Sequence, residues 1–158
     1  MKFKSSLLAL VLPVSCALIV GCAATRPSDV NYGDGSVGNL MYEMNHANEA
    51  GQPEKALIYA DKLIKDYTPE AKVAQASLGG YPPDMHKYEY RALMGVGLAL
   101  WVKGNILANK GDKAGALEAL NTLVNDFKYA QYQSYEGEVR RPAEDARQKI
   151  EELKAGMS

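Results

Sequence analysis

The spacing of apolar residues along the chain predicts α-helices over most of residues 39–158. Apolar positions recur at intervals of three and four, as on one face of a helix, and no stretch shows the strict alternation of a half-buried strand. Together with the glycines and prolines that interrupt it, the pattern predicts helices over about 39–50, 53–67, 68–78, 85–109, 113–127 and 142–155. We therefore expect an all-α domain.

The start of the chain has a different pattern. Lys2 and Lys4 precede an apolar run over 7–20, which is shorter than the roughly 20 residues of a transmembrane helix. A basic start, a short apolar centre and a small-residue end are typical of a secretory signal peptide. The sequence therefore predicts that residues 1–21 are a signal peptide.

The end of this segment, Leu-Ile-Val-Gly-Cys at 18–22, resembles the lipobox of bacterial lipoproteins. The resemblance implies cleavage after Gly21 and a covalent lipid on the sulfur of Cys22, which would anchor the chain in a membrane. The residues before Cys16 fit the lipobox pattern less well. An ordinary signal peptide with an incidental cysteine, or an uncleaved anchor, is the alternative.

Residues 22–38 are predicted to form a lipidated flexible tether. Polar residues, glycine and proline dominate this segment, and Val30, Tyr32 and Val37 supply too little large apolar surface to order it. In the sorting rule of enterobacterial lipoproteins, an Asp directly after the cysteine retains the protein in the inner membrane. Because Ala23 stands there instead, the resemblance implies the periplasmic face of the outer membrane.

Charge and side-chain chemistry narrow the classes of function. Loss of the signal peptide removes two lysines and no acids, which leaves 16 basic against 19 acidic residues and disfavours nucleic acid as a partner. With Cys22 lipidated, the mature sequence has no free thiol, and it has no phosphate-binding glycine loop or HExxH pair. His46 and His86 have no recognisable metal partners. We expect no catalytic residues, no metal site and no cofactor apart from the covalent lipid.

Two segments of the chain, 51–67 and 111–127, repeat each other without gaps. In each, a glycine precedes an alanine by five residues, and Ala56 and Ala116 are expected where two helices pack closely. This pattern resembles the second half of a tetratricopeptide repeat. The resemblance implies about two helical hairpins, with an inserted short helix and a C-terminal capping helix, over residues 39–158. The copies are 60 residues apart, longer than that family's repeat, and a generic helix bundle is the alternative.

Stacked hairpins of that family line a concave groove with the first helix of each hairpin. Counting back from each glycine places the following residues on that groove or beside it: Met41, Asn45, Asn48, Trp101, Asn105 and Asn109. Asn45 and Asn105 occupy equivalent positions, as do Met41 and Trp101. The resemblance implies that the asparagines hold the backbone of an extended peptide, since an amide both donates and accepts hydrogen bonds. The alternative is that Trp101 is a core residue and the asparagines are solvated.

Tyrosine is frequent, with ten residues in the chain, and Tyr81, Tyr88 and Tyr90 lie in or after the predicted insertion. Such rings suit protein interfaces and also stack on sugars. Two classes of function follow. The first is a membrane-anchored interaction scaffold or adaptor that binds an envelope protein or peptide during envelope assembly or secretion. The second is a glycan-binding module for peptidoglycan or exported polysaccharide.

Overall fold

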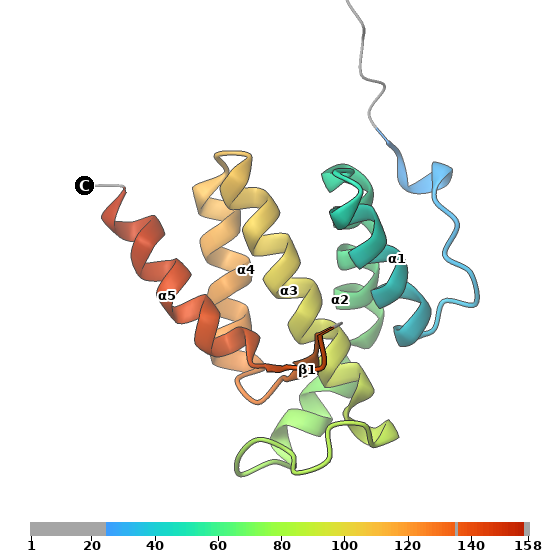
Figure 1. Cartoon of the computed structure of the whole chain (residues 1–158), viewed down its shortest axis with the longest axis vertical. Helices are drawn as coiled ribbons and strands as arrows, with labels where there is room; N and C mark the ends of the chain where they lie inside the picture. The colour runs from blue at the N-terminus through green and yellow to red at the C-terminus, as the bar shows by residue number, and fades with distance from the viewer. Residues whose placement is uncertain (1–24, 135, 157–158) are drawn as a thin grey trace, which may run out of the picture.

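The chain folds into an all-α domain, as its hydrophobic spacing predicts. The computed structural model describes residues 25–134 and 136–156 (Figure 1). Its helices are α1 (Val37–Glu49), α2 (Pro53–Ala76), α3 (Arg91–Asn109), α4 (Lys113–Asp126) and α5 (Pro142–Ala155), with short 3-10 turns η1 (Pro27–Asp29) and η2 (Tyr88–Tyr90). The strands β1 (Tyr132–Gln133) and β2 (Val139–Arg140) form one antiparallel pair.

Two helical hairpins, α1–α2 and α3–α4, form most of the domain. Each hairpin turns at a glycine in the left-handed region, Gly51 at φ +67° and Gly111 at φ +83°, a conformation that glycine adopts without steric cost. Pro53 occupies the first turn of α2, and the carboxylate of Asp112 accepts a hydrogen bond from the Gly115 N–H, 2.9 Å away, at the start of α4. The repeated glycines therefore mark two equivalent turns.

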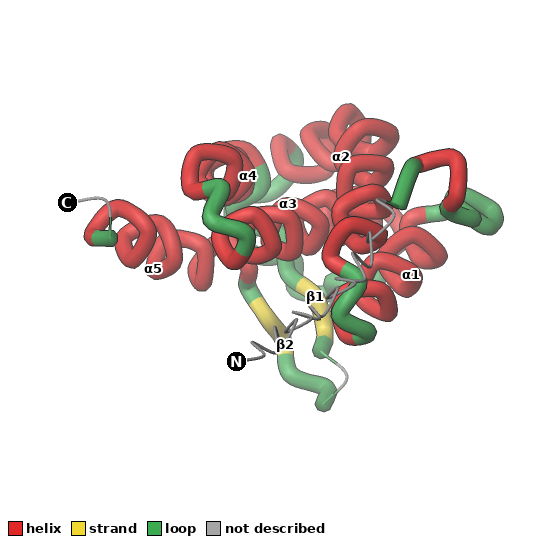
Figure 2. Tube along the Cα trace, turned by 90° about the horizontal axis from the view of Figure 1, so that it is seen from above, coloured by secondary structure: helices red, strands yellow, loops and turns green. Residues whose placement is uncertain are grey.

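Helix α3 lies at the centre of the domain and packs against all four other helices. Seen from above, α1, α3 and α5 lie toward the side that carries the strands, and α2 and α4 lie toward the opposite side (Figure 2). The segment Tyr88–Asn109 is long and apolar enough to cross a membrane by length and composition alone, but 61% of that apolar window is buried inside the domain. Such burial is typical of the central helix of a protein core.

Two predicted helix boundaries are wrong. The short separate helix expected from Thr68 is instead the last part of α2, which continues through Pro69 to Ala76. Proline removes one hydrogen bond from the helix, but Ala71 and Ala74 are buried in the core beyond it, and this packing favours continuation. The long helix expected from Met85 begins only at Arg91, after the turn η2.

The predicted tether is also shorter than expected, because residues 30–36 pack against the first hairpin. We call this segment the strap. Val30 is buried, the Tyr59 hydroxyl donates to the carbonyl of Asn31 over 2.9 Å, and the Tyr67 hydroxyl donates to the carbonyl of Gly35 over 2.8 Å. Each hydroxyl lies about thirty residues further along the chain than the carbonyl it bonds, so the local composition of the strap does not predict these contacts.

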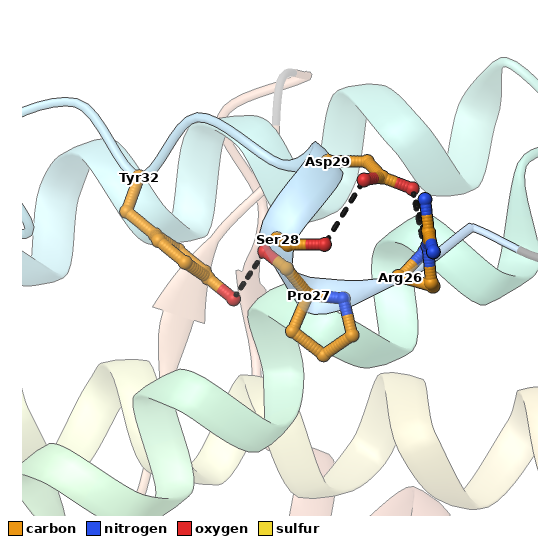
Figure 3. A network of polar contacts seen from close by, with 5 residues as sticks. All are labelled: Arg26, Pro27, Ser28, Asp29 and Tyr32. Atoms are coloured by element: carbon orange, nitrogen blue, oxygen red, sulfur yellow. Dashed lines mark hydrogen bonds and ion pairs between the residues drawn. The ribbon is translucent and has the colours of Figure 1, made fainter.

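A small polar network precedes the strap, at η1. Arg26 contacts Asp29 through its main-chain N–H and its Nε, both 3.3 Å from the carboxylate (Figure 3). The Tyr32 hydroxyl donates to the carbonyl of Pro27 over 3.4 Å. The described part of the chain is therefore folded back on itself from residue 26 onward, whereas Cys22 and the signal peptide lie outside the described residues.

Candidate functional site

A groove of about 490 Å³ lies between α1, α3 and the segment around β1. It is lined by Met41, Tyr42, Asn45, Asn48, Glu49, Leu98, Trp101, Val102, Tyr132, Gln133, Ser134 and Glu136. Four of the six residues predicted for a groove are among them. The structure therefore brings Met41, Asn45 and Asn48 of the first hairpin opposite Trp101 of the second.

The helical repeat explains how these side chains meet. Met41, Asn45 and Asn48 are spaced by four and three residues, so they share one face of α1. The opposite face of that helix is apolar and buried in the core, which orients the amide face toward the groove. On α3, the buried side chains of Leu98 and Val102 form the apolar floor.

Trp101 belongs to the core and to the groove at once. Its half-buried side chain packs against both core clusters of the domain and also lines the groove. The two readings of this residue that the sequence left open are therefore compatible. A tryptophan held by core packing on one side presents a rigid apolar surface on the other.

The sequence did not predict the third wall of the groove, which comes from Tyr132, Gln133, Ser134 and Glu136. Tyr132 pairs with Arg140 in the two-stranded sheet, and the Gln133 amide donates to the carbonyl of Gly137 over 3.0 Å. Burial raises the pKa of Tyr132 above its ordinary value, which keeps the hydroxyl neutral. Two-residue strands are too short to give a periodic signal, so only the frequency of tyrosine near this segment pointed to it.

Asn105 and Asn109 do not line this groove. Asn105 lines a second hollow of about 250 Å³ between α3 and α5, together with Trp101, Asp145, Gln148, Lys149 and Glu152. The Asn105 amide already donates to the carbonyl of Trp101 over 2.8 Å. Asn109 is exposed at the end of α3 and lines neither hollow. The predicted set of six residues is therefore divided by the structure.

The predicted tyrosine surface is not a single patch either. Tyr81 packs edge-on against Tyr129, and Tyr90 packs against the larger core cluster. Tyr88 alone of the three is widely exposed, at 76%, with the Arg91 guanidinium 5.3 Å from its ring centre. Two of the rings thus help to hold the segment between α2 and α3 on the domain.

The charged groups that line the groove are the carboxylates of Glu49 and Glu136. The pKa of Glu136 is lowered, chiefly by a hydrogen bond from the Ser134 side chain, so this exposed group is ionised at neutral pH. His46 stacks on Tyr42 with 6.1 Å between ring centres. Among the described residues, no three His, Cys, Asp or Glu side chains are grouped closely enough to hold a metal ion.

Comparison of the chain with protein-family models, with curated proteins and with solved structures found no match. The groove is therefore interpreted from its own geometry. It combines an apolar floor, aromatic rings, side-chain amides and two carboxylates, and these groups can all contact a ligand.

Proposed function

We propose that this protein is a membrane-anchored lipoprotein of the cell envelope whose groove binds an extended segment of a protein partner. The observation that carries the proposal is the meeting of Asn45 and Asn48 of α1 with Trp101 of α3 in one groove. An extended chain offers main-chain donors and acceptors at regular intervals, together with alternating side chains for the apolar floor.

The amides of the groove are available for such a ligand. Within the described residues, neither the Asn45 nor the Asn48 side chain makes a hydrogen bond, whereas that of Asn105 is bonded to its own helix. Each free amide has both donors and acceptors, so it can pair with a peptide backbone of any sequence. The two groups lie one helical turn apart on α1, which suits contacts along an extended strand.

Two further features support the wider proposal. The paired hairpins with equivalent glycine turns agree with the resemblance to tetratricopeptide repeats, whose groove face binds peptides. The lipobox ending at Cys22 supports a lipid anchor, and Ala23 supports the periplasmic face of the outer membrane. The protein would then act as an interaction scaffold or adaptor in envelope assembly or secretion, with no catalytic step of its own.

The proposal can be tested by photo-crosslinking in cells that produce the full chain. A photoreactive phenylalanine analogue at Tyr42, which lines the groove and is 60% exposed, should form adducts with a protein partner. The same analogue at Val73, which is 72% exposed on α2 away from the groove, is the matched control. Adducts of equal yield at both positions would contradict the proposal.

A second arm tests the amides directly. Asn45→Ala with Asn48→Ala should reduce the Tyr42 adducts about tenfold or more, because loss of a paired amide costs about 1–3 kcal/mol of binding. Asn109→Ala removes an exposed amide outside the groove and should leave the yield unchanged. Melting temperatures of all variants should match that of the wild type.

A glycan is the second candidate ligand. Tyr42, Trp101 and Tyr132 present aromatic rings to the groove, and such rings stack on sugars. Sedimentation of the full chain with purified peptidoglycan, lost in Trp101→Ala and without any protein adduct at Tyr42, would favour this alternative.

A further inference from the structure

The groove and the second hollow are both lined by Trp101 and so lie next to each other on the surface formed by α1, α3 and α5. Four carboxylates line this face, from Glu49, Glu136, Asp145 and Glu152. We call it the acidic face. It involves three helices, α1, α3 and α5, whereas the groove that the repeat pattern predicts involves only the first helix of each hairpin.

The cations near the acidic face compensate its carboxylates only in part. Among the described residues, Lys149 is the one basic side chain that lines either hollow, and its Nζ lies 3.5 Å from the Glu152 carboxylate. The guanidinium of Arg140 is paired with Glu138 over 2.8 Å, and its charge is also a minor cause of the lowered pKa of Glu136. Lys103 of α3 is paired with Asp61, and both residues line a different hollow among α2, α3 and α4.

Because the described lining of this face holds four carboxylates and one lysine, it favours positive charge in its ligand. Resting on the proposed function, we propose that the occupant is an extended peptide segment rich in lysine and arginine. Its cations pair with Glu49 and Glu136 at one end and with Asp145 at the other, and one of them stacks over the ring of Trp101. An acidic segment would be repelled from the same surface.

The experiment selects a random-peptide display library on the full chain held in detergent micelles. Peptides recovered on the wild type should be enriched in lysine and arginine relative to the input library. Glu49→Gln with Glu136→Gln removes two charges without changing side-chain shape, and should weaken a recovered peptide about three- to tenfold at low salt. At high salt the difference should shrink, since exposed charges are screened.

A matched control separates local pairing from the overall charge of the protein. Glu70→Gln with Glu118→Gln removes the same net charge from exposed positions outside the acidic face, and should leave peptide affinity unchanged. An equal loss in this control would overturn the inference, because the effect would then come from the net charge alone.

The two proposals fail in different ways. Recovered peptides without basic enrichment, whose binding is still lost in Asn45→Ala with Asn48→Ala, would overturn the cationic ligand and leave the peptide groove standing. Peptides that bind the double asparagine variant as well as the wild type, or no recovered peptide at all, would overturn the proposed function as well.

Discussion

Tyr81 joins two parts of the chain that are 63 residues apart. Its hydroxyl donates to a carboxylate oxygen of Glu144 over 2.9 Å, its ring meets that of Tyr129 edge-on, and the Arg141 guanidinium lies 4.3 Å from the ring centre. These contacts hold the loop after α2 against the start of α5. Burial and the hydrogen bond to Glu144 raise the pKa of Tyr81 from 10.0 to about 12.

The raised pKa gives a prediction for alkaline pH. The folded state holds the Tyr81 proton more tightly than the unfolded state, so its contribution to stability is complete below about pH 10 and is lost as pH rises through about 12. In an ultraviolet titration of tyrosinate, Tyr81→Phe should remove one tyrosine that ionises late. The free energy of unfolding of this variant should also fall less steeply between about pH 10 and 12 than that of the wild type. Tyr88→Phe, which changes an exposed ring, is the control. An unchanged late step in Tyr81→Phe would contradict the assignment.

At the scale of elements, the two helices of the second hairpin approach closely. A Cβ built on Gly104 of α3 would lie 2.6 Å from the side chain of Leu120 on α4, so only glycine fits there. Ala116, one turn before Leu120, is fully buried, as the repeat predicted. Small residues at such a crossing let two helices pack backbone to backbone, and a larger side chain has no space to enter.

Ala116→Leu should therefore destabilise the domain. Extra methylenes in a packed crossing cost about 1–3 kcal/mol of unfolding free energy, and the melting temperature followed by circular dichroism should fall by several degrees. Ala114→Leu makes the same chemical change at an exposed position of the same helix and should have little effect. If Ala116→Leu melted at the wild-type temperature, the close crossing would not exist in solution.

The elements also show what the sequence could and could not predict. The helices follow from apolar spacing, and the bounds of α5 coincide with the predicted 142–155 because Pro142 starts it and Gly156 follows it. The end of α2 was missed because burial of Ala71 and Ala74 outweighs the local effect of Pro69. Such burial depends on distant partners, and it leaves no mark in the local pattern.

The candidate site likewise contains residues that the sequence predicted and residues that it did not. Met41 and Trp101 were found because the repeat places them at equivalent positions on α1 and α3. The wall of the groove from β1 and the wall of the second hollow from α5 were missed, since their residues reach these sites through tertiary packing alone. Asn105 lies one turn after Trp101 on α3, where it faces residues of α5 and lines the neighbouring hollow instead.

At the scale of the whole molecule, α3 makes the domain a single unit. Its Leu93 and Val96 belong to the core cluster shared with α4 and α5, and its Leu98 and Ala99 belong to the cluster shared with α1 and α2. Both hairpins therefore depend on the same helix. We expect the domain to unfold in one cooperative step and the groove to be lost with it.

The proposed anchor gives a prediction for the intact chain. Cys22→Ser should abolish fatty-acid labelling and release the protein from membranes, because two or three acyl chains hold it there in the family that the lipobox resembles. Cys16→Ser should leave labelling and membrane attachment unchanged. Persistent labelling of the Cys22 variant would show that the lipid is carried elsewhere.

The strap sets how far the domain can travel from such an anchor. The buried Val30 lies eight positions after Cys22, whereas an unpacked tether would run sixteen positions to Gly38. A fully extended chain spans about 3.5 Å per residue, so the segment from Cys22 to Val30 is at most about 28 Å long. The lipid anchor would restrict the domain to a thin layer beside the bilayer. A partner could bind only if its binding segment reached into that layer.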